Sequence, residues 1–166
     1  MRFPLVLTAL LITLVCFVPG YGQIENQKLF TPIPTSQREG FIARLNLYIE
    51  YSLKDQQDKL ETLYDEDTLC SLCKGKRECV DNCRPPMTAE VPEGYRSVLI
   101  ALRPLKVRPY TAAPSWNYYI EAEQQERVSW KGKPSRIVKS KVRLFAVYQN
   151  GDWFFSLLSA GGLIKL

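Results

Sequence analysis

The stretch that decides the fold is residues 138–158, which read VKSKVRLFAVYQNGDWFFSLL. Apolar and basic side chains alternate over its first half, and this period of two is typical of a β-strand. The dipeptide Asn150-Gly151 predicts a type I′ turn, because both central residues of that turn need a positive φ. Two long antiparallel strands are therefore expected. The first has an apolar face of Val138, Val142, Leu144, Ala146 and Tyr148, and a basic face of Lys139, Lys141 and Arg143.

The residues upstream predict helices followed by further strands. A helix capped by Thr35 or Ser36 should run to about Leu53, and Glu39 lies three residues after Ser36, which fits a capping box. A shorter helix follows it and should end at the acidic run 65–67. Helices before a meander of about four strands indicate an α+β fold, with N-terminal helices packed on a curved antiparallel sheet. The further strands are expected over 95–107 and over 116–130. The first has apolar residues on both faces, which suggests burial on both, while Pro104 and Pro109 make it irregular or place part of it at an edge.

The first residues have the pattern of an export signal. Arg2 precedes an apolar core at 5–18, and Gly20-Tyr21-Gly22 offers a cleavage site between small residues. The alternative is an uncleaved anchor, but the apolar run is shorter than the roughly 20 residues that a spanning helix needs. We therefore expect a signal peptide at 1–22, a polar linker at 23–34 and a single domain at 35–166. The protein should be secreted or periplasmic, with no membrane attachment after cleavage.

Composition narrows the classes of function. The net charge is +5, or +4 without Arg2, which is too modest to indicate nucleic-acid binding. The chain has no histidine, so it lacks the commonest general base and the commonest zinc ligand. Any catalysis would have to use carboxylate, tyrosine, lysine or cysteine side chains. We expect no cofactor and no metal.

Three segments resemble a known superfamily. They are FIARLNLYIEY at 41–51, DKLETLY at 58–64 and AVYQNGDWFFS at 146–156. Together they are similar to nuclear transport factor 2-like proteins, the superfamily of SnoaL-like and ketosteroid-isomerase-like proteins, and in particular to its secreted bacterial members. The resemblance implies a cone-shaped, cystatin-like roll with a concave pocket between helices and sheet, and a possible homodimer. It does not transfer a catalytic set, because no carboxylate here aligns with the base of those enzymes.

Four cysteines lie close together at 70–83, where the superfamily usually has its third helix. In an exported chain an even number of cysteines indicates disulfides, which would staple this segment. Nested bridges, 70 to 83 and 73 to 79, would fit two facing helical turns, although four cysteines allow three connectivities. The alternatives are a four-thiolate zinc site and a redox pair. The cysteines are Cys70, Cys73, Cys79 and Cys83.

Three further groups of side chains are candidates for a site. Gln124 and Glu126 interrupt an apolar strand face, so Glu126 is a buried general acid or base if that face points inward, and a solvated residue if the strand bulges. A set of aromatic residues lines a ligand pocket or simply packs in the core. A basic run forms a solvated face or binds a polyanion. The aromatic set is Tyr48, Tyr64, Tyr118 and Trp130, joined by Tyr51 and Tyr148, and the basic run is Lys131, Lys133, Arg136, Lys139, Lys141 and Arg143.

The sequence therefore favours an exported, non-enzymatic binding or interaction module. Its partner would be a small apolar molecule or another protein, and not a nucleic acid. One alternative is a small ketosteroid-isomerase-like enzyme that uses Glu126 with a tyrosine. The other is a zinc-stabilised domain.

Overall fold

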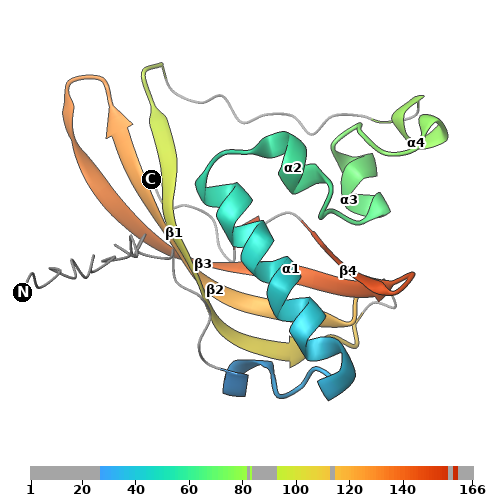
Figure 1. The fold of residues 1–166 in the computed structure, drawn as a ribbon. Coiled ribbons are helices and arrows are strands. Elements are labelled where there is room, and N and C mark those ends of the chain that lie inside the picture. The colour runs from blue at the N-terminus through green and yellow to red at the C-terminus, as the bar shows by residue number, and fades with distance from the viewer. Residues whose placement is uncertain (1–26, 82, 84–92, 113–114, 157–158, 161–166) are drawn as a thin grey trace, which may run out of the picture.

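The computed structural model describes residues 27–81, 83, 93–112, 115–156 and 159–160, and the expected signal peptide lies outside these ranges. Helices come first along the chain and strands follow, so the predicted α+β class is confirmed (Figure 1). The helices are η1 (Gln27–Phe30), α1 (Thr35–Leu53), α2 (Gln57–Glu61), α3 (Glu66–Ser71) and α4 (Arg77–Asp81). The strands are β1 (Arg96–Pro109), β2 (Tyr118–Trp130), β3 (Lys133–Gln149), β4 (Asp152–Phe155) and β5 (Ser159–Ala160).

The strands form one antiparallel sheet in the order β1-β2-β3-β4, and β5 pairs with β3 beyond the end of β4. The predicted type I′ hairpin is confirmed: Gln149 pairs with Asp152, and the turn residues Asn150 and Gly151 have φ of 53° and 84°. The second strand of this hairpin is shorter than predicted, since β4 has only four residues. Leu157 and Leu158, which the prediction included, lie outside the described residues.

The inner face of the sheet packs on α1, which lies inside the bend of the long strands (Figure 1). Phe41, Leu45 and Tyr48 are the buried stripe of this helix, at the spacing the sequence predicts. The Phe41 ring packs edge-on against Trp153, with ring centroids 4.9 Å apart. Opposite them the sheet buries mostly small and branched side chains, which form one core cluster with α1 where the resemblance implied a concave pocket. These sheet residues are Val107, Ile120, Ala122, Val142, Leu144, Ala146 and Phe155.

The domain begins earlier than predicted. Phe30 and Ile33 are fully buried, so the polar linker ends before Pro34. The predicted capping box is wrong, because Pro34 occupies the N-cap and no side chain bonds there. Arg38 instead fastens the entry segment to α1: its Nε donates to the Phe30 carbonyl at 3.1 Å and its Nη2 to that of Ile33 at 3.0 Å. Burial of two apolar side chains outweighs the polarity of the residues around them.

The acidic run at 65–67 starts a helix and does not end one. Asp65 is the N-cap of α3, and its carboxylate accepts a hydrogen bond from the Thr68 amide at 3.1 Å. Glu66 and Asp67 then lie in the first turn, where the helix dipole favours negative charge. The prediction was wrong because an acidic residue near a helix end is equally suited to start the next helix.

Two disulfides staple the segment that follows, and their pairing is interleaved. Cys70 bonds Cys79, and Cys73 bonds Cys83, with Cα atoms 5.4 Å apart in each pair. The nested pairing is therefore wrong. Cys73 follows the end of α3 with a φ of 59°, so the chain turns there and the two matched helical turns that nesting assumed do not form. With all four cysteines in disulfides, none of them is left as a thiolate to bind zinc.

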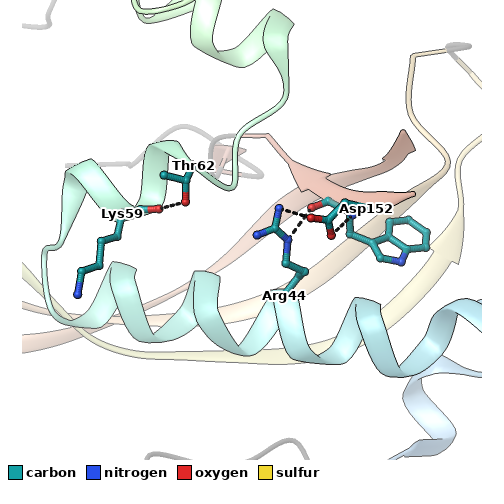
Figure 2. Close-up of polar contacts among 5 residues, drawn as sticks. Arg44, Lys59, Thr62 and Asp152 are labelled. Atoms are coloured by element: carbon teal, nitrogen blue, oxygen red, sulfur yellow. Dashed lines mark hydrogen bonds and ion pairs between the residues drawn. The ribbon is translucent and has the colours of Figure 1, made fainter. Parts of the chain in front are cut away.

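The outer edge of β4 is covered by the connection between α2 and α3 and by a side chain of α1. Leu63 accepts a hydrogen bond from the Phe155 amide at 2.8 Å, and the Phe155 carbonyl accepts one from the Asp65 amide at 3.2 Å. Arg44 of α1 reaches the same edge, as Figure 2 shows: its Nη2 pairs with Asp152 at 2.7 Å and its Nε donates to the Trp153 carbonyl at 3.3 Å. A covered edge cannot pair with another strand.

The opposite edge of the sheet is β1, an irregular edge strand as Pro104 and Pro109 predicted, but its burial differs from the prediction. Its register against β2 shifts at Leu99/Ala101 and again at Pro104/Lys106. These shifts exchange the faces on which side chains lie, so the strand is not buried on both sides: Val98 is 57% exposed and Leu105 is 41% exposed. Bulges and prolines are typical of edge strands.

Candidate functional site

An open hollow of about 410 Å³ lies at the end of the sheet where five elements meet. This size falls within the range of small-molecule sites. The first turn of α1 contributes Gln37, and the turn end of the last hairpin contributes Tyr148 and Trp153. The remaining lining residues come from the end of β1 and the start of β2: Pro109, Tyr110, Thr111, Trp116, Asn117 and Tyr118.

Aromatic rings form most of the wall and brace one another. Trp153 is the floor, being only 1% exposed, and its indole Nε1 donates to the Gln37 carbonyl at 3.3 Å. The rings of Tyr118 and Tyr148 lie against it, with centroids 5.8 Å and 5.1 Å away. The Tyr118 hydroxyl also donates to the Pro32 carbonyl at 3.2 Å. Rings held from several sides lose little freedom when a ligand binds.

The other side of the hollow is braced from the outer face of the sheet. Phe145 on β3 contacts the ring of Tyr110 at 4.9 Å and that of Trp116 at 5.9 Å, measured between centroids. The hollow therefore lies at the rim of the sheet, with aromatic packing on both faces of the strands behind it.

Asn117 holds the strand ends at the hollow together. Its backbone amide donates to the Ala146 carbonyl at 2.9 Å, and its backbone carbonyl accepts from the Tyr110 amide at 2.9 Å. Its side-chain Oδ1 accepts from the Tyr148 amide at 2.7 Å. One residue thus connects β1, β2 and β3 at the point where Tyr110 and Tyr148 enter the wall.

The chemistry of the lining is neutral. None of the nine lining side chains carries a formal charge, and the polar groups are hydroxyls and amides. Such a wall offers π-faces to a ring and a few hydrogen-bonding groups to fix its orientation. It has no group suited to proton transfer near neutral pH.

The structure separates the four aromatic residues that the sequence grouped. Tyr118 lies in the hollow, and Tyr48 and Tyr64 lie in the core, 1% and 3% exposed. The Tyr48 hydroxyl donates to the Ser156 carbonyl at 3.2 Å. Burial raises the pKa of Tyr64, and the Glu61 carboxylate adds to the increase, while hydrogen bonds with Gln57 and Tyr48 oppose it.

Trp130 and Glu126 lie toward the other end of β2. Trp130 is exposed and contacts Tyr95 and the Lys133 ammonium. Glu126 lies on the inner face as one alternative predicted, since β2 pairs with β3 without a shift from Tyr118 to Val128. It is half-buried, and it accepts hydrogen bonds from the Ser97 hydroxyl at 2.8 Å and from the Gln124 amide.

Glu126 and the hollow are far apart. Eight residues of an extended strand separate Glu126 from Tyr118, or about 26 Å at ~3.3 Å per residue. The structure therefore does not bring the hollow to this carboxylate. Among the described residues, no group of three or more acidic or cysteine side chains is arranged to hold a metal ion.

Sequence reasoning missed most of the hollow. Of its aromatic lining it singled out Tyr118 and Tyr148, whereas it assigned no site role to Tyr110, Trp116 or Trp153. The available signal was the density of aromatic residues at 110–119 and 145–155. The sequence pattern did not show that these two segments pair with each other. Only the register of β2 against β3 places Tyr118 beside Ala146.

Comparisons with known proteins add no relative: no family model, no curated protein and no solved structure matches this chain. No helix within the described ranges is long and apolar enough to cross a membrane. The two disulfides are typical of proteins that fold in an oxidising compartment.

Proposed function

We propose that this protein is an exported, non-enzymatic binding module of nuclear transport factor 2-like type, and that the aromatic hollow holds its ligand. The ligand is a small, uncharged, ring-containing molecule. The observation that carries the proposal is the wall itself: five aromatic rings around an open space of ligand size, with no charged side chain among them.

The packing of the rings supports binding over simple core packing. Trp153 has the role of a core residue, but the Tyr148 ring that lies against it is 37% exposed. An exposed ring fixed by its neighbours offers a prepared surface, and stacking on such a ring contributes about 0.5–1.5 kcal/mol beyond the area it buries. Two or three such contacts would give a weak to moderate affinity for a small ligand.

The separation between Glu126 and the aromatic hollow supports a binding role over the enzymatic alternative. A ketosteroid-isomerase-like site needs its carboxylate base beside the ring of the substrate. Here the candidate base, Glu126, lies about eight residues along β2 from the aromatic wall and already accepts two hydrogen bonds. Export is proposed on the pattern of residues 1–22 and on the two disulfides.

The test uses the three indole N–H groups of the chain, which give separate NMR signals. Trp116 and Trp153 line the hollow, and Trp130 lies toward the other end of β2. On titration with indole, or with the neutral disaccharide cellobiose, we expect the first two signals to shift in a saturable manner. The Trp130 signal should not move.

The matched variants are Trp116→Ala and Trp130→Ala, which remove the same side chain at different places. We expect Trp116→Ala to weaken binding about tenfold, as loss of one stacked ring would, and Trp130→Ala to leave it unchanged. The proposal fails if neither compound shifts the two signals at millimolar concentration, or if both variants weaken binding equally.

A further inference from the structure

The sheet has an outer face, turned away from α1, on which positive charge is concentrated. The register defines which side chains share this face, because residues paired across strands point to the same side. One row across the sheet is Arg103, Glu123 and Lys141, and the next is Lys106, Glu121 and Arg143. We call the following set the basic face: Arg96, Arg103, Lys106, Arg108, Arg127, Lys139, Lys141 and Arg143, with Glu121 and Glu123 among them.

A bulge in β1 places two of these cations on the basic face. The register shifts between Pro104 and Lys106, so Leu105 is the extra residue. Strict alternation from Arg103 would turn Lys106 and Arg108 inward and Val107 outward. The shift reverses all three, so that Val107 is buried and both cations join the outer rows.

Positive charge is in clear excess on the basic face. Its eight cations against two carboxylates leave an excess of six positive charges, whereas the net charge of all 166 residues is +5. The rest of the chain therefore sums to a charge of −1. All eight cations are exposed, whereas Glu121 and Glu123 are only half-exposed.

The two carboxylates arrange the cations without neutralising them. They lie on the central strand, β2, and each is flanked by a cation on β1 and another on β3. Arg108 Nε, for example, lies 4.0 Å from Glu121. The result is two lines of cations, one along each flanking strand, in which neighbours on one face are about 7 Å apart.

A role in solubility alone does not explain this pattern. Charge on an edge strand discourages pairing between sheets, and that accounts for the cations of β1. The same reason covers Lys139 and Lys141, since β3 pairs with β2 alone over this stretch of the described residues. It does not cover Arg143, which pairs with β5, or Arg127, which lies on the central strand β2. Like charges gathered on one face repel one another, and an anionic partner would relieve that repulsion.

We propose that the basic face binds a linear acidic polysaccharide, a chain bearing carboxylate or sulfate groups. The long strands bend around α1, so this face is on the outside of the bend (Figure 1). A planar membrane would touch only part of a surface curved in this way, whereas a flexible chain follows it. Nucleic acid is disfavoured because the rings on this face, Tyr119 and Phe145, lie at one end of the lines of cations and not between them, and the Arg143 guanidinium already lies over the Tyr119 ring. The disulfides place the protein where acidic polysaccharides occur.

The experiment measures binding of a heparin-derived octasaccharide by calorimetry at low and at moderate salt. We expect affinity to fall steeply with salt, because bound counterions are released when cations engage a polyanion. The double variant Lys139→Gln/Lys141→Gln should weaken binding about tenfold, and Arg103→Gln/Lys106→Gln similarly. Lys54→Gln/Lys59→Gln, which removes two charges from the helical layer, is the control and should change binding about twofold at most.

Several outcomes would overturn the proposal. If the control pair weakens binding as much as the two sheet pairs, net charge and not the basic face attracts the ligand. If uncharged dextran binds as tightly, charge is not the determinant. If vesicles rich in phosphatidylglycerol or single-stranded DNA bind more tightly than the octasaccharide, the partner is of another class. Thermal unfolding of each variant establishes that it folds.

Discussion

The guanidinium of Arg44 lies 2.7 Å from the carboxylate of Asp152, and this pair joins the main helix to the hairpin turn (Figure 2). Arg44 also donates to the Trp153 carbonyl on the outer edge of β4, and its guanidinium lies 5.6 Å from the centre of the Phe154 ring. Three interactions from one side chain thus fix the short strand that carries the floor of the hollow.

Replacing Arg44 with methionine should lower the free energy of unfolding by about 1 kcal/mol. Most of this loss comes from the missing hydrogen bond to the Trp153 carbonyl, since the ion pair with the half-exposed Asp152 contributes little. The control is Lys54→Met, which removes an exposed pair with Glu50 one helical turn away and should cost about 0.3–0.5 kcal/mol. Urea denaturation of both variants checks this, and equal losses would contradict it.

The turn glycine Gly151 should not tolerate a side chain, whereas the helical Gly40 should. Gly151 has a φ of 84°, so Gly151→Ala forces alanine into the left-handed region at a cost of about 1–2 kcal/mol. Gly40 lies within α1, and a Cβ there would meet no atom nearer than Trp153 Cδ1 at 4.0 Å. Gly40→Ala should therefore stabilise the protein by about 0.5–1 kcal/mol. Opposite changes in melting temperature are expected, and changes of the same sign would refute the assignment of the turn.

The interleaved disulfides can be mapped on the unreduced protein. Combined digestion with trypsin, chymotrypsin and Asp-N separates the four cysteines, because cleavable bonds lie between each neighbouring pair. We expect linked fragments that join Cys70 to Cys79 and Cys73 to Cys83. Recovery of Cys70 linked to Cys83 would show the nested pairing instead. Cys70→Ser/Cys79→Ser should lower stability by about 2–3 kcal/mol, as expected for a loop of this length.

Stability should fall in alkaline solution partly because of Tyr64. Burial raises the pKa of its hydroxyl in the folded protein, so the unfolded chain loses this proton at a lower pH than the folded one. The contribution is complete below the unfolded pKa of about 10 and is lost as pH rises through the folded value. Urea denaturation at about pH 8 and at about pH 11 measures how far the free energy of unfolding falls between the two. This fall should be smaller for Tyr64→Phe than for the unmodified protein. Tyr148→Phe, at an exposed ring, is the control, and it should keep the full decrease.

Local patterns predicted the elements well. The alternation at 138–148, the Asn150-Gly151 turn and the stripe of Phe41, Leu45 and Tyr48 depend on residues close in sequence, and each appears where expected. The predictions were wrong where the same local pattern fitted two structures equally well. Residues 65–67 could end one helix or begin the next, and four cysteines allow three pairings.

The candidate sites depended on information that is not local. Glu126 and the grouped tyrosines were chosen because they broke or enriched a pattern, but the fold distributed them between core, hollow and opposite ends of β2. Trp116 and Trp153 carry no distinctive pattern of their own. Their role follows from the meeting of α1, β1, β2, β3 and β4 at one end of the sheet.

By itself, then, the order of residues determined an α+β fold and the hairpin at Asn150-Gly151, since side-chain alternation and turn chemistry act over a few positions. Only the tertiary structure decided what the two faces of that hairpin do. Pairing with β2 placed Tyr118 beside Ala146 and so opened the aromatic hollow. The bulge at Leu105 added Lys106 and Arg108 to the face of Lys141 and Arg143, because one extra residue in a strand exchanges inside for outside.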